Sequence, residues 1–155
     1  MKILTESTLL GLWHETVHEA EEALHITLKT DLEAYLVFLL MRYTNKPEFP
    51  EVRLPPIFLE SMQHPSQYRF DAMQSVGDRC LLISGLFPAI TEKRHVHSRY
   101  FIELGQTAYD VISSNQNDLY SLLSQHFIIL TNVLQSFRPY TAKVLPWKIR
   151  KIWEK

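Results

Sequence analysis

Apolar residues recur at steps of three and four along most of this 155-residue chain. That spacing gathers side chains on one face of an α-helix, whereas a half-buried β-strand would alternate apolar and polar residues. No long stretch of the sequence alternates in that way. The spacing therefore predicts an all-α fold, and we expect a single compact bundle of about five main helices.

Prolines and polar stretches divide the helical pattern into segments. Thr30 is a suitable N-cap for an almost wholly apolar segment, so we expect that second helix to be central and buried. Pro88 and Pro139 end two of the later segments, because proline cannot donate the helical hydrogen bond. The predicted helices cover residues 10–24, 31–43, 66–87, 101–112 and 118–137, with a short helix near 56–63.

The charges are distributed unevenly, although the net charge is only −1. Residues 1–60 carry −5, residues 61–136 carry −1 and residues 137–155 carry +5. We expect one helical domain over residues 1–145, followed by a basic aromatic tail over residues 146–155. A chain with an acidic body and a basic tail can self-associate, or its tail can reach an acidic partner.

The tail reads PWKIRKIWEK and interleaves tryptophans with basic residues. Such a segment suits an acidic protein groove, a membrane surface or nucleic acid. We favour docking onto the acidic body of its own chain or of a second copy over contact with a membrane surface. Nucleic acid is not expected as a partner, because phosphates would repel the acidic body. The candidate contact residues are Trp147, Lys148, Arg150, Lys151 and Trp153.

The single cysteine, Cys80, cannot form an internal disulfide, which fits a reducing compartment. Residues 1–12 show no signal-peptide pattern, and the longest apolar runs are shorter than the roughly 20 residues that span a bilayer. We therefore expect a cytoplasmic protein. The chain has 4 glycines and no glycine-rich phosphate-binding motif. We accordingly expect neither nucleotide binding through such a loop nor a cofactor.

Histidines line one edge of the first predicted helix. His14 and His18 stand four residues apart, a spacing at which two imidazoles can bind one metal ion. Two E-x-x-H matches, ending at His18 and His25, lie on this one helix. Di-iron carboxylate bundles place that motif on two helices, so the pattern departs from theirs. We favour a polar flank of an amphipathic helix, and a metal site at His14 and His18 remains the alternative.

A second group of candidate residues comes from three predicted helices. His126 falls near the centre of the apolar stripe of the last helix, where a buried imidazole needs hydrogen-bond partners. It is either a core histidine satisfied by its neighbours or a ligand-facing one. Asp78 is either a surface acid or a carboxylate near the core that must be paired. Tyr100 and Tyr109 complete the candidate ligand site, which would lie between helices.

Three stretches together carry a family resemblance. GDRCLLISGLFP at 77–88, YFIELGQTAY at 100–109 and EAYLVFLL at 33–40 resemble a small family of uncharacterised bacterial all-α proteins of similar size. The resemblance covers approximately residues 30–115. It implies a bacterial source and carries no activity over to this chain.

No Ser-His-Asp unit, Cys-His unit or Gly-x-Ser-x-Gly motif can be read from the sequence. The leading hypothesis is therefore a non-catalytic interaction or regulatory protein that self-associates or binds a protein partner. The alternative is a helical bundle that binds a small molecule or a metal, either as a binding protein or as an enzyme. In that alternative the site would lie between helices around His126 and Asp78.

Overall fold

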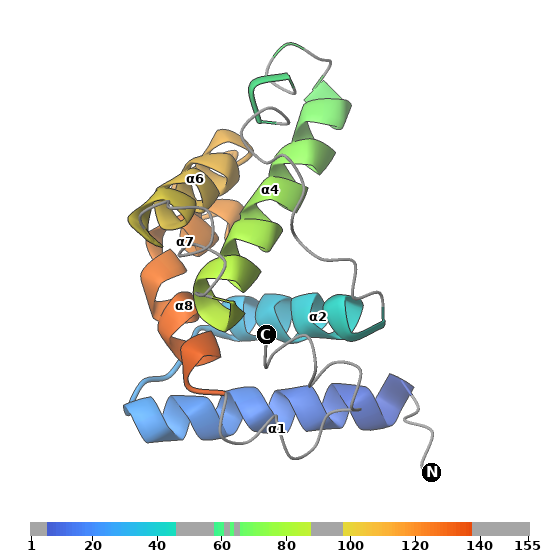
Figure 1. Ribbon diagram of the computed structural model, residues 1–155, viewed down its shortest axis with the longest axis vertical. Coiled ribbons are helices and arrows are strands. Elements are labelled where there is room, and N and C mark those ends of the chain that lie inside the picture. The colour runs from blue at the N-terminus through green and yellow to red at the C-terminus, as the bar shows by residue number, and fades with distance from the viewer. Residues whose placement is uncertain (1–5, 46–57, 61–62, 64–65, 88–97, 138–155) are drawn as a thin grey trace. The chain divides into compact units, whose positions relative to one another are not determined.

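The computed structural model describes residues 6–45, 58–60, 63, 66–87 and 98–137, and the secondary structure of this part of the chain is helical (Figure 1). The all-α prediction is confirmed. The helices are α1 (Glu6–Leu24), α2 (Thr30–Asn45), α4 (Ser66–Leu86), α6 (Ser98–Val111), α7 (Leu119–Gln125) and α8 (Phe127–Gln135).

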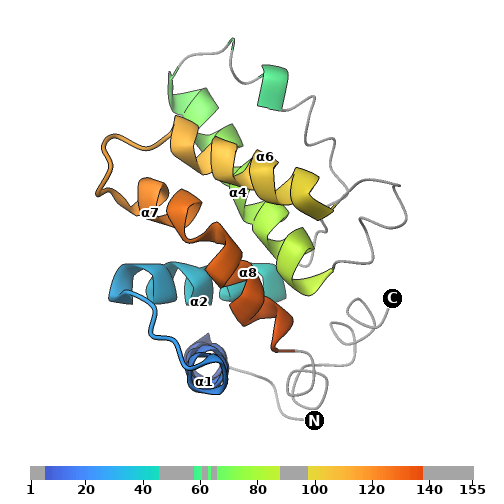
Figure 2. The same ribbon diagram turned by 90° about the vertical axis from the view of Figure 1, so that its left-hand side faces the viewer.

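The chain divides into two compact units, and each is described by itself. The first unit comprises Met1–Glu48 and Asn132–Lys155, and the second comprises Phe49–Thr131. Within the first unit, α1 packs against α2. Within the second unit, α6 packs against both α4 and α7 (Figure 2). The expected single domain over residues 1–145 stays a prediction.

Trp13 anchors the core of the first unit. Its ring is buried, and the ring centroid lies 6.0 Å from that of Phe137. The indole Nε1–H donates a hydrogen bond of 2.9 Å to Oγ1 of Thr44 near the end of α2. Thr44 in turn donates to the carbonyl of Leu40 at 2.7 Å. The indole thus ties α1 to the last turn of α2 through both apolar packing and a hydrogen bond.

The chain reverses direction between α1 and α2 through a Schellman motif. The Ile26 N–H donates to the Glu21 carbonyl at 3.0 Å, and the His25 N–H donates to the Glu22 carbonyl at 3.2 Å. These two bonds satisfy carbonyls that the end of a helix leaves unpaired. His25 takes a φ of 56° at the position that glycine usually occupies.

The second helix begins at Thr30, where a cap was expected, and most of its apolar side chains are buried. The expected burial of this helix is incomplete, because Phe38 is 56% exposed. Phe38 lies on the same face as Asp31 and Arg42, and charged groups hold that face toward water. The buried residues of α2 are Leu32, Leu36, Val37, Leu39, Leu40, Met41 and Tyr43.

Two glycines let aromatic rings lie directly on helix backbones in the second unit. A Cβ atom built at Gly77 of α4 would lie 2.5 Å from Cε1 of Tyr109. One built at Gly105 of α6 would lie 2.5 Å from Cζ of Phe127. Real Cβ atoms do not approach rings so closely, so each ring occupies the space that a side chain would need.

The predicted helix over residues 118–137 is two helices, which corrects the expectation of one. The chain leaves helical geometry at His126, with φ −103° and ψ 16°. Ser124 explains the break, because its Oγ donates to the Gln106 carbonyl at 2.9 Å. The Gln106 amide in turn lies 3.5 Å from the Ser124 carbonyl. A side chain from α6 thus reaches a carbonyl that an uninterrupted helix would use itself.

The short helix predicted near residues 56–63 is described only in part. Residues 58–60 are helical, and the Gln63 N–H donates to the Glu60 carbonyl at 3.1 Å. The rest of that segment lies outside the described residues. The first of the predicted long helices is confirmed as α1, and the segment from Ser66 is confirmed as α4.

Candidate functional site

Asp78 and Tyr109 form a buried pair in the second unit. Asp78 is 6% exposed on α4, and Tyr109 is fully buried on α6. The Tyr109 hydroxyl donates a hydrogen bond of 2.6 Å to Oδ1 of Asp78. Leu82, one turn further along α4, is buried as well. Asp78 is therefore a paired carboxylate near the core and not a surface acid.

An aromatic cluster surrounds the Tyr109 ring. Its centroid lies 6.0 Å from that of Phe127 and 6.2 Å from that of Tyr120. Tyr120 also meets the Phe70 ring edge-on at 5.2 Å, and its hydroxyl accepts a hydrogen bond of 2.9 Å from the Gln74 amide. The Asp78–Tyr109 hydrogen bond therefore lies in packed surroundings that hold both groups in place.

The other two candidates for the ligand site lie elsewhere in the second unit. Tyr100 is 40% exposed, and its ring packs edge-on against Phe101. It precedes Tyr109 by nine residues on α6, about 14 Å along the helix axis. His126 is half-buried between α7 and α8. The His126 backbone N–H donates to the Leu122 carbonyl at 2.9 Å, and the His126 carbonyl accepts from the Leu130 N–H at 3.0 Å.

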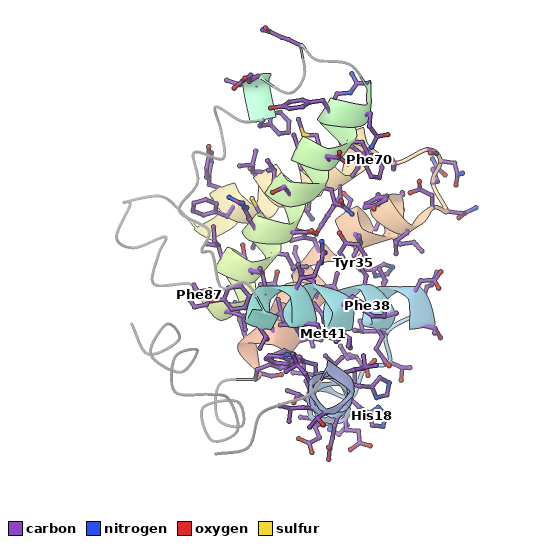
Figure 3. The ribbon with its side chains drawn as sticks, turned by 90° about the vertical axis from the view of Figure 1, so that its right-hand side faces the viewer. His18, Tyr35, Phe38, Met41, Phe70 and Phe87 are labelled. Carbon is purple, nitrogen blue, oxygen red and sulfur yellow. The ribbon has the colours of Figure 1, made fainter. Side chains whose placement is uncertain are left out.

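His14 and His18 contact glutamates rather than each other. His14 Nε2 lies 3.2 Å from Glu33 Oε1 on α2. His18 lies 3.7 Å from Glu21 and 3.5 Å from Glu22, and Figure 3 shows it on α1. We call these five residues the histidine–glutamate cluster. Over the residues that the structure describes, no three His, Cys, Asp or Glu side chains are placed to hold a metal ion.

Glu21 is the buried member of the histidine–glutamate cluster, and its side chain is only 5% exposed. Its Oε1 accepts a hydrogen bond of 2.7 Å from the Leu28 N–H, in the segment that leads into α2. Burial raises the pKa of Glu21, and the neighbouring Glu33 raises it further, whereas the Leu28 N–H and His18 act in the opposite direction. The net effect is a raised pKa, so the protonated form of this carboxyl is more favoured in the folded protein than in water.

Glu21→Gln is expected to raise the free energy of unfolding at neutral pH and to have a smaller effect in acid. A carboxyl whose pKa is raised in the folded state stabilises most below its ordinary value of 4.5. That stability is lost as the pH rises through the raised pKa. Glutamine carries no charge at any pH and keeps an oxygen for the Leu28 N–H. Urea unfolding at about pH 4 and pH 7 measures the difference.

The matched control for this prediction is Glu22→Gln. The Glu22 side chain is 72% exposed on the same helix, so its replacement should change the stability by less than about 0.5 kcal/mol at either pH. A gain for Glu21→Gln that is equal at both pH values would contradict a titrating Glu21.

An exposed stripe on α2 combines apolar and charged side chains. Phe38 lies at its centre, with Tyr35 half-buried one turn before it. Asp31 and Arg42 are exposed at its two ends. Figure 3 labels Tyr35 and Phe38 on α2. We call these four residues the α2 face.

The tail residues Trp147, Lys148, Arg150, Lys151 and Trp153 lie outside the described residues, and their expected contacts stay predictions. No helix in the described part of the chain is both long and apolar enough to cross a bilayer.

No protein-family model, no curated protein and no solved structure matches the chain. The bacterial source implied by the sequence resemblance stays an expectation. What the described residues define is an all-α protein with one buried carboxyl–phenol pair, one histidine–glutamate cluster and one exposed aromatic helix face.

Proposed function

We propose that the protein is a non-catalytic interaction protein that self-associates through the α2 face. The observation that carries the proposal is the exposure of Phe38, which leaves 56% of a phenylalanine in water on a helix whose other large apolar residues are mostly buried. Fully burying an exposed phenylalanine side chain is worth about 1.5–3 kcal/mol, and covering the exposed part of Phe38 would contribute about half of that. Covering Phe38 in a complex would therefore favour association.

A second copy of this chain is the partner that the charges support. The α2 face has an acid, Asp31, at one end and a base, Arg42, at the other. A two-fold symmetric interface brings one patch against the same patch of a second molecule, so the patch must be self-complementary. A face that carries both signs of charge around an aromatic centre meets that requirement.

Phe38→Asp is expected to weaken the dimer by about tenfold to a hundredfold in Kd, because the apolar centre is lost and each copy places a charged carboxylate in the interface. Sedimentation velocity over a concentration series, together with native mass spectrometry, measures the dimer fraction. A single pair of helices buries less than the roughly 1,200–2,000 Å² of a standard interface. The series should therefore reach high micromolar concentrations.

Ile128→Asp is the matched control, since Ile128 is an aliphatic residue that is 54% exposed on α8. It should leave the dimer fraction unchanged. Circular dichroism should give the same helix content for both variants. A wild-type chain that stays monomeric throughout the series, or two variants that weaken the dimer equally, would overturn the proposal.

The same proposal includes a cytoplasmic location. It is supported by Cys80, which the fold keeps as a buried free thiol, as in proteins of reducing compartments. Fractionation of cells that express the full chain would test it.

A further inference from the structure

The four residues of the α2 face form a narrow stripe, and their spacing along the helix limits how a second copy of α2 can align with it. At 100° per residue, Asp31, Tyr35, Phe38 and Arg42 lie within about 60° of one another around the helix. Asp31 and Arg42 are about 16 Å apart along the axis. The face is therefore a single stripe of three turns with opposite charges at its ends.

The direction of the partner helix follows from these charges. In a parallel pair, each copy would set Asp31 beside Asp31 and Arg42 beside Arg42, and like charges in contact are unfavourable. In an antiparallel pair, the acid of each copy meets the base of the other. The helix dipoles also oppose one another favourably in the antiparallel arrangement.

The register follows from the aromatic residues. Placing Asp31 opposite Arg42 puts the two-fold axis midway between them, at positions 36 and 37. The same axis places Tyr35 of one copy opposite Phe38 of the other, which is a favourable aromatic pair. One alignment thus satisfies the two charges and the two rings at once.

Arg42 can take part in this pairing while it keeps an interaction within its own chain. Its guanidinium carries five N–H donors in a planar fork. Its exposure on α2 makes it accessible to that copy.

We infer that two copies of this chain pair antiparallel along α2, with Asp31 of each copy bound to Arg42 of the other and Tyr35 packed against Phe38. The inference rests on the self-association proposed above and adds the direction and register of the interface. A single dimer contains two Asp31–Arg42 pairs and two Tyr35–Phe38 pairs.

Charge reversal tests the ion pairs. Asp31→Arg and Arg42→Asp should each raise the Kd of the dimer by about fivefold to thirtyfold, because two pairs are lost and replaced by repulsion. The double variant Asp31→Arg/Arg42→Asp restores opposite charges in every pair, so its Kd should return to within about threefold of wild type. A double variant as weak as the singles would overturn the pairing.

Crosslinking tests the direction independently. In the antiparallel register, position 31 lies about 16 Å along the axis from position 31 of the second copy, and the same holds for position 42. A thiol crosslinker shorter than this distance should join Asp31→Cys protein to Arg42→Cys protein in a mixture, and it should leave each protein alone unlinked. The native Cys80 is buried and should not react.

Each result separates the inference from the function on which it rests. Crosslinking of Asp31→Cys protein by itself would show parallel helices and overturn the inference. The inference would also be overturned if the mixture of Asp31→Cys and Arg42→Cys proteins were not crosslinked while the dimer still depended on Phe38. The proposed self-association would stand in that case. A wild-type chain without any dimer would overturn both.

Discussion

Tyr109→Ala is expected to lower the free energy of unfolding by about 3–5 kcal/mol, the range for removing a large buried aromatic side chain. The Tyr109 ring is fully buried between Gly77 and Phe127. Its loss would also remove the 2.6 Å hydrogen bond to the buried carboxyl of Asp78. Urea unfolding followed by circular dichroism measures the change. Tyr109→Phe separates the two contributions, since it should cost only the about 1–3 kcal/mol of the hydrogen bond.

Gly77→Ala provides an internal test of the same contact. In the wild-type background, the added Cβ would lie 2.5 Å from the Tyr109 ring, so the substitution should cost about 1–3 kcal/mol. In the Tyr109→Ala background the ring is absent, and the substitution should become stabilising because alanine is the better helix former by about 1 kcal/mol. The control is Gly11→Ala, since nothing lies within 4 Å of a Cβ there. Equal effects of Gly77→Ala in both backgrounds would contradict the contact.

Trp13→Ala should have an effect of similar size in the first unit, about 3–5 kcal/mol. The indole is buried against Phe137 and donates to Thr44, so its removal leaves a large cavity in the α1–α2 pair. The loss of stability can be measured in urea and, independently, as a fall in melting temperature.

Trp13→Phe serves as the graded control for this site. It keeps a large apolar ring but loses the Nε1–H, so it should cost clearly less than alanine. The Thr44 hydroxyl keeps its own bond to the Leu40 carbonyl in that variant. A cost below about 1 kcal/mol for Trp13→Ala would show that the indole is not part of the core.

The helices could be predicted because their signals are local. Apolar residues three and four apart, together with Pro88, predicted a helix over residues 66–87, and α4 is found at Ser66–Leu86. Asp118 was expected at the start of the last helical segment, and it is the N-cap of α7. Such signals lie within a few residues of the element that they define.

The break at His126 could not be predicted from the same signals. It depends on Ser124 and Gln106, which are 18 residues apart and meet only when α6 packs against α7. The apolar spacing continues through residue 126, so the sequence pattern is that of an uninterrupted helix. A tertiary contact therefore decided the geometry there.

The candidate residues divide in the same way. Asp78 and Tyr109 were selected by residue type, and the hydrogen bond between them spans 31 residues of sequence that no spacing rule covers. Glu21 was missed as a buried group. A signal was present, since Glu21 follows Val17 by four residues and so continues the apolar stripe of α1. The approach of Glu33 from α2 had no sequence signal.

The reactivity of Cys80 measures how often the helices of the second unit open. The thiol is buried on α4, so a reagent cannot reach it in the closed protein. Burial also raises the pKa of the thiol well above its usual range, which keeps it in the less reactive protonated form. Alkylation must therefore wait for the surrounding helices to separate. Its rate under native conditions reports how often they do, in a chain that needs no added label. Because Cys80 is the one cysteine of the chain, every alkylated molecule has opened at the position of Cys80.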